Sequence, residues 1–207
     1  VSLCPFIWEP ILIKNQHKKY NYNYNDCNIN NIGVFESNIL PVKSLIIPTY
    51  ICEKLDKETN LLNKLNITNL SKYWKKQEFH DDFNSLLIVK KGKVDCLKIP
   101  VYPLFKWIKE QEIKTIVSHQ VYNELNYLHL EALYLGLPLV HNSNVLKDYG
   151  YYYPDFSVNK GAEQLKNVIL NHDDNDEYLN KCKECIFKFS IYNQDNINGY
   201  KKLLSVL

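Results

Sequence analysis

The sequence predicts an α/β protein with a Rossmann-like, mainly parallel sheet flanked by helices and followed by a helical C-terminal tail. Short apolar runs of strand length alternate with longer segments whose apolar residues recur at helical spacing. With 207 residues, 45% of them hydrophobic, the chain is long enough to bury a substantial core. A helix–Gly–x–Pro–strand passage over 131–140 shows how tightly the two element types follow one another.

Seven apolar runs have the length expected of strands. In chain order they are 1–7, 32–35, 65–68, 94–99, 115–118, 138–141 and 150–153. Asn-rich sequence over 15–31 separates the first two and is expected to be an exposed connection. The run that ends before Pro154 is expected at a sheet edge, because proline cannot donate to a strand ladder.

Helical spacing predicts seven helices: 41–54, 79–89, 105–111, 123–135, 162–170, 177–189 and 196–207. We expect Pro48 to kink the first helix, Gly92 to end the second and Gly136 to end the fourth. The chain is therefore expected to be one domain, with a strand and linker over 1–31, an α/β core over 32–160 and the helical tail over 161–207.

Composition excludes several partners. The net charge is only +2, so no overall field favours nucleic acid or a membrane surface. The longest apolar run, 132–140, is interrupted by Gly136 and Pro138 and is far shorter than the roughly 20 residues of a membrane span. All 25 basic residues are Lys, and Asn, Ile and Tyr are also abundant, which is typical of an A/T-rich genome such as that of a giant virus, a protist or some bacteria.

Six cysteines in mostly apolar settings indicate reduced thiols and a cytoplasmic location. Cys182 and Cys185 form a lone C-x-x-C within a helical pattern, which is either a zinc or redox pair or simply two helix cysteines. The chain contains no Met and opens on Val1, so we expect it to be a piece of a longer protein or a processed product.

In a parallel sheet, ligands bind beyond the carboxyl ends of the strands. This rule marks four loops: 36–40, 98–103, 118–126 and 141–145. The loops contain few glycines, and the chain has neither a G-x-G-x-x-G motif nor a P-loop. These absences argue against a dinucleotide-dependent oxidoreductase and a P-loop NTPase.

The densest polar cluster, Ser118 to Tyr127, lies between a predicted strand and a predicted helix, where the helix N-terminus favours an anion. A second polar set, 141–144, leaves the next strand. If the two strands are neighbours, His119 and Asn142 face one pocket. The alternative is a helix cap, at Ser118 or Asn123, with ordinary polar loops. Tyr149 and the three tyrosines from Tyr151 either stack on a base or sugar or are half-buried strand residues.

Glu131 opens the passage E-A-L-Y-L-G-L-P-L-V, which looks like the donor-site signature of GT-B glycosyltransferases, where an acidic residue reaches the ribose of a nucleotide-sugar. An exposed helix glutamate is the alternative. Further motifs, F-E-S-N, V-S-H-Q, L-N-Y, L-V-H-N-S and G-Y-Y-Y-P, resemble in that order the uncharacterised, GT-B-like family known as domain of unknown function 2827. The resemblance covers essentially the whole chain.

The resemblance implies the C-terminal, donor-binding half of a glycosyltransferase, with a UDP- or GDP-linked sugar as donor, a glycan or protein as acceptor, and an N-terminal domain that this chain lacks. It implies no metal and no further cofactor. Lys98, Lys43 and helix N-terminal amides would stabilise the diphosphate leaving group, with His119 beside it. The implied catalytic residues are His119 and Lys98, and the implied donor-binding residues are Glu131, Ser118, Asn123, Asn126, Tyr127, His141, Asn142, Ser143, Glu36, Asn38 and Lys43.

Two departures from the resemblance keep alternatives open. Asn123 stands where an E-x7-E pattern ending at Glu131 calls for an acid, and Glu124 is one residue out of register. Lys98-Ile99 replaces the usual Gly-Arg, so a point charge replaces the bidentate guanidinium. A non-catalytic nucleotide-sugar-binding or interaction module is therefore the second hypothesis. A receiver-like regulatory domain is disfavoured, because no acidic cluster ends the first strands.

Overall fold

A computed structural model describes residues 4–20, 27–37, 42–70, 77–97, 104–173 and 176–205. Its strands are β1 (Asn28–Val34), β2 (Lys64–Thr68), β3 (Val94–Leu97), β4 (Ile113–Val117), β5 (Leu139–His141) and β6 (Tyr151–Tyr152). Its α-helices are α1 (Ile11–Tyr20), α2 (Ile46–Thr59), α3 (Gln77–Ser85), α4 (Leu87–Lys90), α5 (Leu104–Glu110), α6 (Tyr127–Tyr134), α7 (Val158–Asn171), α8 (Asp176–Lys188) and α9 (Gln194–Leu204), and Asn144–Leu146 forms a 3-10 turn.

The six strands form one sheet in the order β3-β2-β1-β4-β5-β6, and each neighbouring pair of these strands is parallel. The sheet and its flanking helices confirm the predicted α/β class, and β6 lies at the edge as expected. The chain builds outward from β1 to β3 and then crosses to the other side of β1 to form β4. The carboxyl ends of β1 and β4 are therefore the topological switch point, where an open α/β sheet has its ligand crevice.

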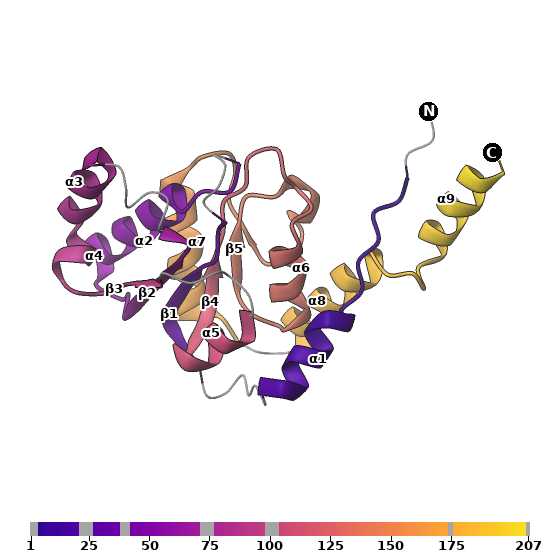
Figure 1. Cartoon of the computed structure of the whole chain (residues 1–207), viewed down its shortest axis with the longest axis horizontal. Helices are drawn as coiled ribbons and strands as arrows, with labels where there is room; N and C mark the ends of the chain where they lie inside the picture. The colour runs from indigo at the N-terminus through magenta and orange to yellow at the C-terminus, as the bar shows by residue number, and fades with distance from the viewer. Residues whose placement is uncertain are drawn as a thin grey trace.

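Two apolar cores cover the two faces of the sheet (Figure 1). Successive residues of β4 point to opposite faces, so Ile116 packs with α5, α6 and α8, while Val117 packs with α2 and α7. Leu139 and Val140 of β5 divide in the same way. Because both faces are covered, these strands appear in the sequence as continuous apolar runs rather than as alternating ones.

The start of the chain differs from the prediction. In residues 4–10, expected in part as a strand, no strand is formed, and the Trp8 amide instead donates to the Phe189 carbonyl at 2.9 Å. Parts of the Asn-rich segment, expected as an exposed connection, belong to regular elements, since α1 extends to Tyr20 and β1 begins at Asn28. The apolar N-terminal segment gains its burial against the C-terminal helices, which the periodicity of the sequence does not show.

Three helix predictions are also corrected. Pro48 lies in the first turn of α2, where its missing N–H has no helical partner to lose, so it produces no kink. The helix expected over 79–89 is two helices, because the Glu53 carboxylate accepts from the amides of Leu87 and Ile88 at 2.9 and 3.0 Å and restarts the chain as α4. The helix expected from Asn123 begins at Tyr127.

None of the six cysteines forms a disulfide, and among the described residues no group of three His, Cys, Asp or Glu side chains is arranged to hold a metal ion. Burial raises the pKa of Cys182 to about 11 and that of Cys185 to about 12. In the described part of the chain, no helix has both the length and the apolarity needed to cross a membrane.

Candidate functional site

Polar side chains from the loops after β1 and β4 meet at the switch point of the sheet. The Ser118 hydroxyl donates to Glu36 Oε1 at 2.6 Å, and the side-chain amide of Gln120 donates to Glu36 Oε2 at 2.7 Å. Glu36 follows β1, whereas Ser118 and Gln120 follow β4. The parallel pairing of β1 with β4 thus brings together two of the loops that the sequence marks as ligand sites.

Glu36 is 1% exposed, and burial raises the pKa of its carboxyl from 4.5 to about 7. Hydrogen bonds from Ser118, Gln120 and the His119 backbone, together with the charge of Lys43, limit this rise. The loop therefore holds a carboxyl group that changes its charge near neutral pH. The predicted contact of Glu36 with a donor stays a prediction, since both oxygens accept from the protein in this structure.

His119 is 2% exposed, and burial lowers its pKa to about 4, so it is neutral at pH 7. Its Nδ1 lies 2.9 Å from the Tyr153 hydroxyl, which donates to the Ser118 carbonyl at 3.2 Å. If the single hydroxyl proton of Tyr153 serves Ser118, Nδ1 carries the proton of the ring and Nε2 is an acceptor. Nε2 is buried and has no hydrogen-bond partner among the residues that the structure describes, while the exposed ring of Phe156 lies 4.7 Å from the His119 ring.

Two further histidines lie behind this cluster. His129 Nε2 is 2.8 Å from the Ser118 hydroxyl, whose proton is directed to Glu36, so His129 is the donor in that contact. His141 Nε2 donates to the Tyr149 carbonyl at 2.7 Å, and Nδ1 accepts from the Ser143 amide at 3.2 Å. Both nitrogens of His141 are thus engaged by backbone. Burial is the main cause that lowers the pKa of His141 to about 4 and that of His129 well below its usual value.

The strands β4 and β5 are neighbours, and the loops that follow them are joined. That His119 and Asn142 face one pocket stays a prediction. The Asn142 side chain accepts from the backbone amide of Gln120 and donates to the backbone carbonyl of Gln120, both at 2.8 Å. Asn123 donates to the Gln120 side-chain oxygen at 3.0 Å. These bonds hold the three residues in one arrangement at the carboxyl end of the sheet.

Glu124 links the start of this region to the loop after β5. Its carboxylate accepts from the Asn144 amide at 2.6 Å, and its carbonyl accepts from the Ser143 hydroxyl at 2.7 Å. The glutamate that is out of register with the E-x7-E pattern thus supports a loop. It could have been found from the sequence only as a carboxylate beside a polar loop.

A cation, Lys43, lies beside the N-terminus of α6. Asn126 is the N-cap, and its side chain accepts from the Leu128 amide. Lys43 Nζ is 3.4 Å from the same Asn126 oxygen, and the Val121 amide donates to the Val42 carbonyl at 3.0 Å. The alternative of an N-cap at Ser118 or Asn123 is therefore corrected to Asn126, and Lys43, which precedes α2 in the chain, lies beside the N-terminus of α6.

The remaining predicted residues divide into two groups. Glu131 lies on α6 and is 7% exposed, one turn after Tyr127, which is 57% exposed. The alternative of an exposed helix glutamate at this position is therefore wrong. Lys98 and Asn38 lie outside the described residues. Gln120 and His129 are not among the predicted site residues, although Gln120 lies within the predicted polar cluster, and Tyr153, a predicted stacking candidate, is fully buried against His119.

Comparison with solved structures finds glycosyltransferases. A variant of TarM from S. aureus, solved with Fondaparinux, alpha-GlcNAc-glycerol and UDP, is 17% identical at a TM-score of 0.64, with 98% of this chain and 44% of that chain covered. Trehalose 6-phosphate synthase from Burkholderia multivorans is 6% identical at a TM-score of 0.65, with 98% and 50% covered. A glycosyltransferase from Rickettsia africae is 13% identical at a TM-score of 0.59, with 99% and 57% covered.

These similarities show the GT-B Rossmann-like fold, and the chain spans 44% to 57% of the length of these three proteins. No curated protein matches the sequence. The family of proteins of unknown function called DUF2827 matches residues 1–204, nearly the whole chain. Sequence and fold thus agree with the resemblance seen in the motifs, and the chain belongs to the DUF2827 family.

Proposed function

We propose that this chain is the donor-binding half of a glycosyltransferase that moves a sugar from a UDP- or GDP-linked donor to a glycan or protein acceptor. The observation that carries the proposal is the meeting of three polar loops at the switch point, with Lys43 beside the N-cap of α6. Solved glycosyltransferases share the fold and support the same reaction class. A preceding GT-B domain would supply the acceptor side of the cleft.

The diphosphate of the donor is proposed to bind at the N-terminus of α6. The amides of the first turn and the Lys43 ammonium both favour a negative group there. In the described residues, Lys43 Nζ reaches the start of α6 only through the Asn126 side-chain oxygen, at the long distance of 3.4 Å. This weak contact leaves the Lys43 ammonium free to turn to a phosphate. Lys98, which directly follows β3 in the sequence, is proposed as a second cation, and Glu131 as the group that accepts from the ribose hydroxyls.

The remaining donor-site residues act around this anion site. Tyr127 lies in the first turn of α6, and Asn123 and Asn142 are partly exposed and both bond to Gln120. Ser118, Ser143 and His141 are buried and are proposed to act by holding the loops that face the donor. His119, neutral at pH 7, would serve as a hydrogen-bonding group rather than as a charge.

In the reaction, the bond between the anomeric carbon and the diphosphate breaks as the acceptor oxygen attacks. Negative charge grows on the leaving diphosphate, and Lys43, Lys98 and the α6 amides would stabilise it in place. Donors fixed in this way need no rearrangement during the step. The chain would thus contribute leaving-group stabilisation, while the acceptor and any base for it come from the preceding domain.

Asn123 favours a second candidate, a nucleotide-sugar-binding module without turnover. Its amide donates to Gln120 at 3.0 Å and supports the loop, where the related pattern has a carboxylate. Both candidates bind the donor, and they differ in transfer. A giant-viral origin, with a location in the host cytoplasm, a viral factory or the virion, is likewise proposed from the composition.

Binding of UDP, GDP and their sugars tests the donor site by calorimetry and thermal unfolding. A ligand at 100 times its Kd should stabilise the chain by about 2.7 kcal/mol. Lys43→Ala should weaken binding at least about tenfold, because a hydrogen bond to a charged group contributes about 1.5–3 kcal/mol. Lys54→Ala is the matched control, since Lys54 pairs with Glu58 on the exposed side of α2.

Three outcomes are informative. Absence of binding by every nucleotide and nucleotide-sugar refutes the donor site. Equal losses in Lys43→Ala and Lys54→Ala refute the assigned anion position. Donor binding without sugar transfer, measured on the chain joined to its preceding domain, favours the binding module.

A further inference from the structure

A second pocket lies at the opposite end of the sheet from the proposed donor site. It has a volume of about 700 Å³ and is enclosed by the start of α1, the end of α6 and one face of α8. Its floor includes Gly136, next to Leu137, which leads into the amino end of β5. The volume is in the range of small-molecule sites, and none of the polar residues at the carboxyl end of the sheet lines it.

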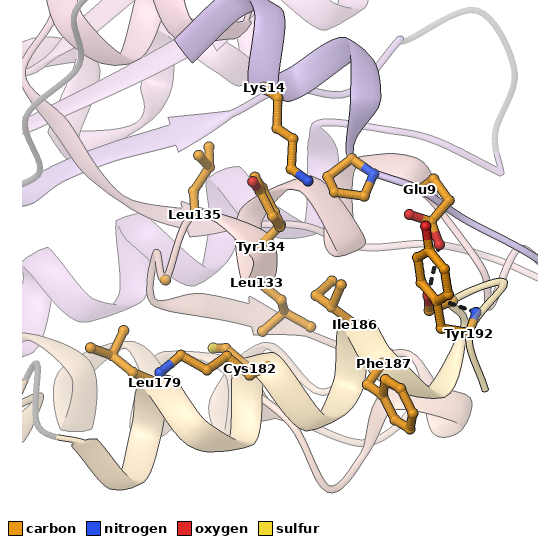
Figure 2. A pocket seen from close by; sticks show the side chains of 14 residues that line it. Glu9, Lys14, Leu133, Tyr134, Leu135, Leu179, Cys182, Ile186, Phe187 and Tyr192 are labelled. Atoms are coloured by element: carbon orange, nitrogen blue, oxygen red, sulfur yellow. Dashed lines mark hydrogen bonds between the residues drawn. The ribbon is translucent and has the colours of Figure 1, made fainter. Parts of the chain in front are cut away.

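Apolar side chains form most of the lining. Leu179, Cys182 and Ile186 recur at helical spacing along α8 and face Leu133 of α6. Figure 2 shows Leu133, Cys182 and Ile186 meeting between the two helices, with Lys14 extending toward them from α1. Phe187 stands at the rim and is 55% exposed. An alkyl chain lying along α8 would cover this surface and be removed from water.

The charged groups of the pocket have unequal partners. The carboxylate of Glu9 accepts from the Ser190 hydroxyl at 2.7 Å and from the Ile191 amide at 3.0 Å, so it serves to hold the chain after α8. Lys14 Nζ has neither a hydrogen bond nor an ion pair among the described residues. Lys183 Nζ has a 3.4 Å contact with Asn180. The charge available to a ligand is therefore positive.

We infer that this pocket binds a single-chain anionic amphiphile, with its head group at Lys14 and its alkyl chain between Leu133 and the apolar face of α8. Charge complementarity selects the anionic head, and the apolar lining selects the chain. The site is separate from the proposed donor site and does not depend on it. A free phosphate would have the head-group contact but would leave the apolar walls in water.

Calorimetry with octyl, decyl and dodecyl phosphate, below their micelle concentrations, tests the inference on the whole 207-residue chain. Affinity should rise by up to about fourfold per added methylene, which corresponds to about 0.8 kcal/mol of transfer free energy. Lys14→Gln should weaken the binding of dodecyl phosphate about tenfold, as expected for loss of a charge-assisted hydrogen bond. Lys18→Gln, on the same helix but not on the pocket, is the matched control and should bind normally.

Ile186→Ser tests the part of the pocket that would hold the alkyl chain, without changing the charge of the pocket. The unfolding curve of this variant shows whether the fold is kept. It should flatten the dependence on alkyl length and leave UDP binding unchanged. An affinity independent of alkyl length, or equal effects of the Lys14 and Lys18 variants, would overturn the inference. Sedimentation with vesicles of anionic lipid without binding of the soluble phosphates would overturn it in favour of a membrane surface. Self-association abolished by Ile186→Ser, again without amphiphile binding, would overturn it in favour of a second copy.

Discussion

Replacing Glu36 by Gln probes the electrostatics of the switch point directly. Glu36 is 1% exposed and accepts from Ser118 and Gln120 at 2.6 and 2.7 Å. Burial raises the pKa of its carboxyl from 4.5 to about 7. Gln has nearly the same shape but carries no charge at any pH, so the substitution removes the ionisation and keeps the volume.

The magnitude follows from the two pKa values. A rise from 4.5 to about 7 is roughly 2.5 pH units, and each unit corresponds to about 1.4 kcal/mol, which together give about 3 kcal/mol. Between these pH values the folded protein binds more protons at Glu36 than the unfolded chain does. The stability that Glu36 contributes is therefore present below pH 4.5 and is lost as the pH rises through about 7. Glu36→Gln lacks this loss.

Urea unfolding of both proteins between about pH 4.5 and about pH 8 measures the difference. The free energy of unfolding of the variant, relative to the wild type, should rise by about 3 kcal/mol across this range. The neutral histidines His119 and His141, with pKa values of about 4, act in the opposite direction. They are present in both proteins, so their effect cancels in the difference.

Glu58→Gln is the control, because Glu58 forms an exposed ion pair with Lys54 on α2. Its difference from the wild type should change little with pH. A constant difference between wild type and Glu36→Gln would show that Glu36 ionises normally and would refute the reasoning. A pH-independent offset added to this rise is expected, since Gln replaces an acceptor by an amide donor, and only the change of the difference with pH tests the reasoning.

Two further substitutions test the backbone and the buried charges. Gly150→Ala should destabilise by more than about 1 kcal/mol, because φ is +67° and the added Cβ would lie 2.8 Å from the Leu139 carbonyl oxygen. Gly92→Ala, at φ +68° with no atom within 4 Å, should cost less in the same urea titration, and equal losses would contradict the steric argument. Asp56→Asn should lower the free energy of unfolding by about 2 kcal/mol, because the buried Asp56 carboxylate accepts from Lys93 at 2.7 Å and from Lys91. A decrease of less than about 0.5 kcal/mol would show that solvent screens these contacts.

Element types could be predicted from the sequence more completely than element ends. The periodicity over 123–135 indicates a helix, but a polar segment with several possible caps precedes it. The structure selects Asn126, because Tyr122 has a φ of +52° and the Glu124 carboxylate is used by the Asn144 amide. The contact between Glu124 and Asn144 joins residues 20 positions apart, so the spacing of apolar residues along the chain does not predict it.

The N-terminal segment shows the same limit for apolar runs. The apolar opening of the chain is equally suited to a strand or to an irregular segment buried elsewhere. Its docking depends on the Phe189 carbonyl, which is 181 residues from Trp8 and pairs with its amide. Periodicity reports the face that an element buries, and it does not report the element against which that face packs.

The sequence by itself determined the α/β class, the order of most elements and the residue types at the carboxyl ends of the strands, because these depend on local apolar periodicity and on the general geometry of parallel sheets. The tertiary structure decided which polar groups face one another. It placed Glu36 against Ser118 and Gln120, and it left Lys43 at the N-terminus of α6. The charge state of Glu36 also follows only from the fold, because desolvation depends on all the atoms around a carboxyl group and not on its neighbours in the chain.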